Sequence, residues 1–375
     1  MLKKLNTYRK PEFFIFFFLI FCSFFSINKL VVNPVYILGA LTLIFSLFYF
    51  KFSSLNKFQF YYIIYFLISI FSFMLGVSSF YNITPDIVYL STVLYLYCLV
   101  LGSATVQIGN ILPQNQRVKV YNLSFNCLIF YMLLDFLIRI ALSGGGGTFY
   151  DFKWGLFYFD SNFSALIILM FLMFSVFLKK NNIYNLGFIK FFILLFLLIT
   201  TFSRAAILAF IISYVLMRYA NKLIVPIALV FSIVSLLFFE MMVKSYMGGE
   251  SFVNIDGSFN SKFYLISIAI DNYQNLPLLN KIFGIGLGNF VYYSNGIFAH
   301  NMLITFFYEF GYVGTILFFL FILISYNRIG KNIFYILIPF FIAGFSLFSA
   351  FMPFFFVLVS CMYLETRPPS EKSIL

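Results

Sequence analysis

The chain has 375 residues, of which 63% are hydrophobic and only 10% are charged, and its mean hydropathy is +1.00. This balance excludes a soluble globular domain and predicts an all-α, polytopic membrane protein. The net charge of +12 would suggest nucleic-acid binding in a soluble protein. In a membrane protein, an excess of lysine and arginine is a topology signal, so we expect no nucleic-acid partner.

Apolar segments follow one another along most of the chain. A transmembrane helix needs about 17–25 apolar residues, so we predict about 11–12 spans in one membrane domain, residues 1–364, followed by a cytoplasmic tail at 365–375. The predicted spans lie near residues 12–28, 33–50, 60–80, 87–105, 121–142, 162–178, 186–202, 204–219, 223–240, 300–325, 333–349 and 351–364. No clear small-x-small cleavage site follows the first apolar run, so we interpret it as an uncleaved helix.

Lysine and arginine are distributed unevenly between the two sides of this arrangement. With the N-terminus inside, most of the 24 basic residues fall in the expected cytoplasmic segments. The outer side and its helix ends hold Lys29, Arg139, Lys153, Arg204, Lys244, Lys262 and Lys281. Because cytoplasmic loops are enriched in lysine and arginine, we expect both termini to be cytoplasmic and two substantial outer loops, at 143–161 and 241–299.

The join at Ser203-Arg204 decides how residues 186–219 cross the membrane. A single helix would place Arg204 in mid-membrane, at a cost of about 2.5–3.5 kcal/mol on insertion scales. Two helices of about 15 residues, the second capped by Ser203, avoid this cost. Each would be about 22 Å long, whereas the hydrocarbon core is about 30 Å thick. We therefore expect Arg204 in a recess below the outer surface; the alternative is that it only snorkels to lipid phosphates.

The first outer loop, SGGGGTFYDFKWGLFYFDS, combines a glycine run with charged and aromatic residues. The glycines give the backbone the freedom of a hinge or lid, although an ordinary mobile loop fits equally well. Lys153 is a candidate contact for an anionic substrate. Trp154 and the nearby tyrosines fit either an interfacial aromatic belt or a platform on which sugars stack.

The second outer loop contains a predicted surface helix and then a glycine-rich turn. The apolar pattern of residues 261–273 suits a short helix lying on the membrane surface, with Lys262 near its start. Gly284, Gly286 and Gly288 follow in GIGLGNF. Without a preceding strand this is not a nucleotide fingerprint, and we interpret it as a tight turn close to a bound substrate.

The only histidine, His300, stands beside Asn301 at the start of the next apolar segment. A lone histidine is usually structural, but this position favours a catalytic or ligand-contacting role for the pair. Glu309 lies about 13.5 Å further along an unbroken helix and half a turn round. An intramembrane acid is a functional-site candidate. We nevertheless interpret Glu309 as an internal brace to a partner such as Arg139 or a backbone amide.

Several catalytic and cofactor motifs are missing. The sequence has no D-x-D, G-x-S-x-G, H-E-x-x-H or Walker motif, and its cysteines show no metal-type spacing, so we expect no metal and no cofactor. The cysteines are Cys22, Cys98, Cys127 and Cys361. Lys153, Arg204 and Lys262 all fall on the expected outer side, as does His300. This set suits an anionic lipid head group such as a diphosphate, which arginine grips with two parallel hydrogen bonds.

Three segments occur in order: TTFSRAAILAF, the stretch from Ser261 through GIGLGNF, and AHNMLITFFYEFGYVG. In this order they resemble motifs of the O-antigen polymerase and O-antigen ligase superfamily of bacterial inner-membrane proteins. KWGLFYFDSN is a weaker match. The motifs cover residues 160–320, and the N-terminal half is similar only in being hydrophobic.

The resemblance implies a metal-independent, inverting glycosyltransferase whose donor and acceptor are undecaprenyl-diphosphate-linked oligosaccharides. By that resemblance, Arg204 and Lys262 stabilise the leaving diphosphate as its charge develops, and His300 orients or deprotonates the acceptor hydroxyl. Family members often have arginine where this chain has Lys262, and lysine cannot make the same fork-shaped contact. The resemblance also implies the bacterial inner membrane, contact with membrane lipid, and a chain-length regulator and a flippase as partners.

Polymerase and ligase share this apparatus. The long outer loop, the short chain and the Phe-rich composition favour a polymerase; the alternative is a ligase that transfers the glycan to lipid A-core. A third alternative is a flippase or transporter of the lipid-linked sugar. That activity would need ionisable residues spread through the bundle and repeats in its two halves, whereas the candidate residues here lie on one side and no repeat is visible.

Overall fold

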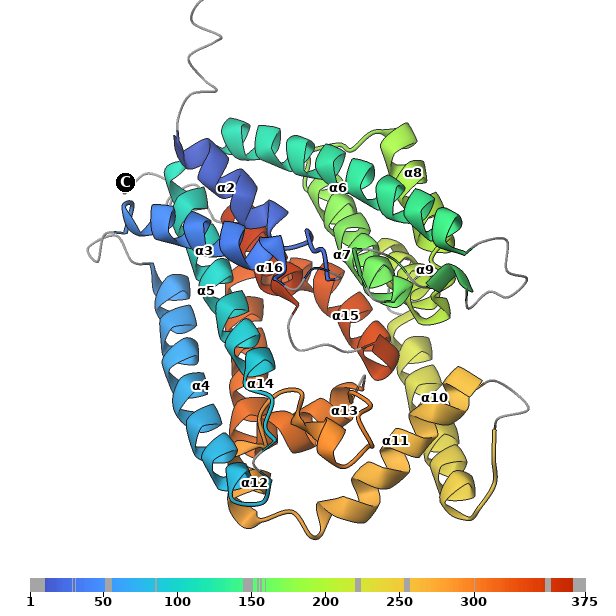
Figure 1. The fold of residues 1–375 in the computed structure, drawn as a ribbon. Helices are drawn as coiled ribbons and strands as arrows, with labels where there is room; N and C mark the ends of the chain where they lie inside the picture. Colours follow the sequence, from blue (N-terminus) through green and yellow to red (C-terminus); the bar gives the residue numbers. More distant parts are fainter. Residues whose placement is uncertain are drawn as a thin grey trace, which may run out of the picture.

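The computed structural model describes residues 11–28, 30, 32–50, 56–84, 86–143, 151–153, 155, 157, 158, 160–219, 224–252, 257–299, 301–347 and 352–366. Within these ranges every regular element is helical (Figure 1), which confirms the predicted all-α class. His300 and Trp154 lie outside the described residues.

The helices follow one another with short connections. They are α2 (Pro11–Phe21), α3 (Pro34–Leu47), α4 (Lys57–Tyr81), α5 (Leu90–Ile111), α6 (Gln114–Leu142), α7 (Ser161–Lys180), α8 (Phe188–Ile199), α9 (Arg204–Tyr219), α10 (Ile224–Met247), α11 (Gly257–Tyr273), α12 (Leu278–Phe283), α13 (Met302–Ile304), α14 (Gly311–Ile329), α15 (Phe334–Leu347) and α16 (Pro353–Thr366). The chain also forms the 3-10 turns η3 (Asp151–Lys153), η4 (Asn289–Tyr292) and η6 (Gly330–Ile333), and the π-helical segment η5 (Thr305–Phe310).

Several helices are long and apolar enough to cross a membrane. Among the described residues, five segments meet this condition: Lys57–Tyr81, Leu90–Ile111, Gln114–Leu142, Ser161–Lys180 and the continuous Met302–Phe345. The helices α2, α3, α8 and α16 are apolar but shorter. The architecture is therefore that of a helical membrane protein, while the number of spans and the orientation of the termini stay predictions.

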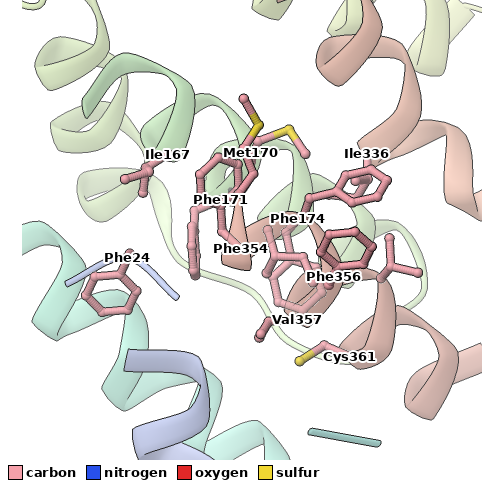
Figure 2. Packing of buried hydrophobic residues seen from close by; sticks show 14 of the residues in the cluster. Phe24, Ile167, Met170, Phe171, Phe174, Ile336, Phe354, Phe356, Val357 and Cys361 are labelled. Carbon is pink, nitrogen blue, oxygen red and sulfur yellow. The ribbon is translucent and has the colours of Figure 1, made fainter. Parts of the chain in front are cut away.

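The helices α7 and α16 lie in the hydrophobic core of the bundle. Both are buried over most of their length. Figure 2 shows side chains of the two helices packed in one cluster, among them Phe171 and Phe174 of α7 and Phe356 and Val357 of α16. The helices that enclose them include α5, which packs along α16, and α9 and α15, which pack against α7.

A buried ion pair fixes the end of α16. Arg117 Nε of α6 lies 2.7 Å from Glu365 Oε1, and the same carboxylate accepts from Tyr121 Oη at 2.9 Å and from Gln114 Nε2 at 3.1 Å. Arg117 Nη1 also donates to Leu112 O at 2.8 Å. Buried charges are tolerated when they are paired and hydrogen-bonded in this way. The contact places Arg117 and Glu365 at the same end of the bundle, as the predicted cytoplasmic location of both residues requires.

Residues 186–219 form two short helices rather than one long helix. The helix α8 has 12 residues and ends at Ile199, and α9 has 16 residues and begins at Arg204. Their lengths are about 18 Å and 24 Å. The predicted break at Ser203-Arg204 is therefore confirmed, and Arg204 lies at a helix end instead of in the middle of a helix.

The polar stretch that follows α10 is largely helical. The predicted surface helix at 261–273 corresponds to α11, which begins at Gly257, and a second short helix, α12, comes after it. Figure 1 shows α11 running between α12 and α10 along one end of the bundle. Its apolar face packs in a second hydrophobic cluster, separate from the main core, that includes Leu265, Ala269, Ile285, Phe290 and Tyr308.

Candidate active site

Arg204 is the first residue of α9 and its side chain is exposed. Phe202 has a φ of +54°, and the chain reverses there between α8 and α9. The carbonyl of Ser203 accepts from Ile207 N at 3.0 Å, so Ser203 occupies the N-cap position. The predicted side-chain cap is wrong, however, because Ser203 Oγ is buried without a hydrogen-bond partner among the described residues.

The placement of Arg204 concentrates positive charge. The first turn of a helix carries unpaired amide groups and the positive end of the helix dipole. The first turn of α9 contains no acidic residue. A guanidinium at this end therefore adds to the positive potential of the helix end instead of neutralising it, which favours binding of an anion such as a phosphate.

A buried network holds the turn before Arg204. Arg139 Nη1 of α6 donates to Thr200 O at 3.1 Å, and Arg139 Nε lies 3.2 Å from Asp135 Oδ2. Ser164 Oγ of α7 donates to the same carboxylate oxygen at 2.9 Å. A second α7 hydroxyl, that of Ser161, donates to Thr201 O at 2.8 Å. The turn is thus bonded to both α6 and α7, and these bonds fix where α9 starts.

Sequence reasoning did not identify this network. Asp135 and Arg139 are four residues apart on one helix, a spacing that places them on one face. That spacing was the available signal, and it would have paired Arg139 with Asp135 rather than with Glu309. Both residues are almost fully buried.

Asn301 links the start of α13 to the end of α15. Its Oδ1 accepts from Leu303 N at 2.8 Å as an N-cap, and its Nδ2 donates to Phe345 O at 3.0 Å. His300, its predicted partner, precedes it outside the described residues. Both polar atoms of the Asn301 side chain therefore form hydrogen bonds within the protein. Its predicted contact with a substrate stays untested.

Asn301 and Arg204 lie at the same end of the bundle. The helix α15 packs along α9. Tyr335, near the start of α15, lines one cavity together with Arg218, near the end of α9. The two helices are therefore antiparallel. Phe345, near the end of α15, then lies toward the start of α9, and Asn301 is bonded to it.

The three glycines of GIGLGNF have positive φ, and they pack against protein. Gly284, Gly286 and Gly288 have φ of +78°, +83° and +82° and are buried. A Cβ at Gly284 would lie 2.2 Å from Glu309 O, and one at Gly286 would lie 2.5 Å from Val77 Cγ2. The structure thus gives these glycines a packing role, and the predicted contact with a substrate stays untested.

Glu309 is bonded to the same glycine turn. Its Oε1 accepts from Gly288 N at 2.9 Å, and its carbonyl accepts from Gly286 N at 3.2 Å. The neighbouring carbonyl of Tyr308 accepts from Ile285 N at 2.8 Å. Two partners were considered for the Glu309 carboxylate, Arg139 and a backbone amide. The structure shows a backbone amide, that of Gly288. Because Glu309 lies in the π-helical segment η5, the even helical spacing assumed between it and His300 does not hold.

The remaining basic candidates lie on two other elements, α11 and η3. Lys262 is half-buried on α11, and Lys153 is half-buried at the end of η3. The loop after the glycine turn approaches α11, with Asn295 Nδ2 3.4 Å from Tyr264 Oη. Burial, together with the adjacent Tyr292 phenol, raises the pKa of Tyr293 in this loop to about 12, so its phenol stays neutral at physiological pH.

The structure places two of the predicted residues on the same side. Arg204 and Asn301 lie toward the same end of the α9–α15 pair, whereas the glycine turn and Glu309 pack together on α4, α5 and α14. Within the described part of the chain, no group of three or more His, Cys, Asp or Glu residues is placed to hold a metal ion. No protein-family model matches the chain, and no curated protein is significantly similar to it.

Proposed function

We propose that this protein is a membrane glycosyltransferase that polymerises a surface polysaccharide from diphosphate-linked lipid carriers. In this proposal it acts as an O-antigen polymerase at the outer face of a bacterial inner membrane. The donor and the acceptor are undecaprenyl-diphosphate-linked repeat units. The proposal combines the resemblance of the motifs around Arg204, Lys262 and His300 with the helical membrane architecture.

The observation that carries the proposal is the position of Arg204. It opens α9 at a break between two short apolar helices, and the turn before it is bonded to α6 and α7. A cation at the positive end of a helix, on a turn that a buried network fixes in place, suits a diphosphate that must be bound while charge develops on it. Asn301, which directly follows the proposed base His300, lies toward the same end of the α9–α15 pair.

The proposed reaction is an inverting displacement at an anomeric carbon. The acceptor sugar hydroxyl attacks that carbon, and the bond from the carbon to the diphosphate oxygen breaks. His300 accepts the hydroxyl proton. The leaving diphosphate carries away the bonding electron pair, and Arg204, with Lys262, stabilises the resulting negative charge.

A deletion strain tests the reaction class. Loss of a polymerase leaves lipopolysaccharide capped with a single repeat unit. Loss of a ligase leaves uncapped core and accumulating lipid-linked polymer, and this outcome would replace the proposed function by the ligase alternative. Failure of single repeats to appear at the outer face would indicate transport instead.

Complementation of that strain tests Arg204 itself. We expect Arg204→Ala to lower polymerisation by about 100-fold or more, the usual cost of removing a donor that stabilises developing charge. Arg204→Lys should retain part of the activity because it keeps the charge but loses the fork geometry. Arg328→Ala is the matched control, since it removes an arginine at the other end of the bundle. All proteins are quantified by immunoblot, and a full polysaccharide ladder with Arg204→Ala would refute the assignment.

A further inference from the structure

A cavity of about 790 Å³ lies at the opposite end of α9 from Arg204. Its lining comes from the end of α7, the connection to α8, the start of α8, the end of α9 and the start of α15. The predicted orientation places this end of the bundle on the cytoplasmic side. The cavity is therefore separate from the proposed active site and remains even if the proposed reaction is wrong.

The cavity forms because α8 is much shorter than its neighbour. The helices α7 and α8 pack together, and Ser161 Oγ is bonded to Thr201 O at their shared end. With 20 and 12 residues, they are about 30 Å and 18 Å long, so α8 begins about 12 Å short of the end of α7. The connection folds back on α7, where Ile183 N donates to Leu178 O at 2.9 Å. Because α8 lacks the extra turns that would reach the end of α7, a cavity remains beside that end of α7.

Three cations line this space. They are Lys179 and Lys180 at the end of α7 and Arg218 near the end of α9, and none of the lining residues is acidic. Arg218 is held in place, because its Nη1 donates to Tyr214 Oη at 2.9 Å and its guanidinium carbon lies 5.6 Å from the centre of the Tyr219 ring. Converging cations without a counter-charge in the same cavity favour an anionic occupant.

A row of exposed phenylalanine side chains extends from the cavity along α8. Phe188 and Phe192 line the cavity, and their spacing of four residues, continued by Phe196, places all three on one helix face. The side chains are 77%, 47% and 52% exposed. An exposed phenylalanine stripe on a membrane helix contacts lipid chains, and this one starts beside the three cations.

We infer that the cavity binds an anionic glycerophospholipid of the adjacent leaflet. The phosphate lies among Lys179, Lys180 and Arg218, and an acyl chain follows the phenylalanine stripe. Basic pockets between transmembrane helices on the cytoplasmic side recognise such head groups. Because α8 is shorter than the hydrocarbon core is thick and begins below the end of α7, the cavity extends below the cations, so a bound lipid can place its phosphate beside them and an acyl chain along α8.

Lipid binding to the purified full-length protein tests this inference. Native mass spectrometry in mild detergent is used to titrate phosphatidylglycerol and, separately, phosphatidylcholine with the same acyl chains. We expect a clear preference for phosphatidylglycerol in the wild-type protein. The double variant Lys179→Gln/Arg218→Gln should bind phosphatidylglycerol about 30-fold more weakly, the effect of removing two basic contacts, while its affinity for phosphatidylcholine stays unchanged.

The matched control is Arg328→Gln/Lys331→Gln, which removes the same charge on the same expected side but outside the cavity, and should keep the wild-type affinity. A second variant, Lys179→Gln/Lys180→Gln, changes two exposed side chains and leaves Arg218 in place; it should also weaken binding. Equal weakening by the control, or no preference between the two lipids, would overturn the inference. Displacement of the lipid by inorganic diphosphate at equal concentration would show a soluble-anion site and would overturn it as well.

Discussion

Replacing Gly284 by alanine tests the packing of the glycine turn against η5. At a φ of +78° and a ψ of 171°, a backbone region essentially restricted to glycine, a side chain strains the backbone by about 1–3 kcal/mol. The new Cβ would also lie 2.2 Å from Glu309 O and 2.7 Å from the carbonyl carbon of Phe310. Both are backbone atoms, which cannot move aside by changing a rotamer, and overpacking costs about 1–3 kcal/mol. We therefore expect Gly284→Ala to lower the free energy of unfolding by about 2–6 kcal/mol.

The buried cysteines provide the assay. Cys98 and Cys361 are almost fully enclosed, so a thiol-reactive dye labels them only on unfolding and reports the melting temperature in detergent. Gly296→Ala is the matched control, because Gly296 has a φ of +87° but nothing lies within 4 Å of its added Cβ. The control shares the positive φ but lacks the clash, so Gly284→Ala should melt at a clearly lower temperature than the control.

Two results would refute this reasoning in different ways. Equal melting temperatures for Gly284→Ala and Gly296→Ala would mean that the contact with η5 is not tight. A Gly284→Ala protein that melts like the wild type but no longer polymerises would support the predicted contact with a substrate in place of the packing role.

Three further substitutions test the buried polar contacts. Glu365→Leu leaves Arg117 buried without its partner and should lower the free energy of unfolding by about 3–5 kcal/mol. The double variant Arg117→Met/Glu365→Leu should recover most of this stability in the same melting assay. A double variant as unstable as the single one would contradict the pairing. Asp135→Asn removes the charge that orients Arg139, and it should reduce the polysaccharide ladder of the complemented deletion strain at equal protein level; an unchanged ladder would separate this network from the reaction. Asn301→Ala loses the N-cap of α13, at about 1 kcal/mol, and Asn301→Ser, which keeps a capping oxygen and places no charge beside Phe345 O, should restore that cap. Similar melting temperatures for the two variants would argue against capping.

Helix positions could be predicted from the sequence because backbone polar groups in a lipid environment must be satisfied within the helix itself. The apolar runs therefore mark the helices, and α8 and α9 meet at the predicted break. The break was predictable because a mid-membrane arginine is costly. The side-chain cap expected from Ser203 was wrong, because its hydroxyl is buried without a hydrogen-bond partner among the described residues.

The contacts around the candidate site were harder to predict. The partner of Arg139 is a carboxylate on its own helix, and the partner of Glu309 is the amide of Gly288, distant in sequence. The first pairing follows from i,i+4 spacing, which makes it accessible in principle. The second depends on how two segments approach in space, which local sequence does not specify.

The sequence by itself determined an all-helical membrane architecture, the approximate ends of the helices and the break that places Arg204 at a helix end, whereas the exposure of Arg204, predicted to lie in a recess, came from the structure. Only the tertiary structure decided that the glycine turn packs on η5 and that Asn301 reaches α15 toward the end where α9 begins. The physical reason is that helices in lipid are apolar on nearly all faces, so hydrophobic periodicity does not show which faces meet. Close packing of small residues and a few buried hydrogen bonds decide it instead.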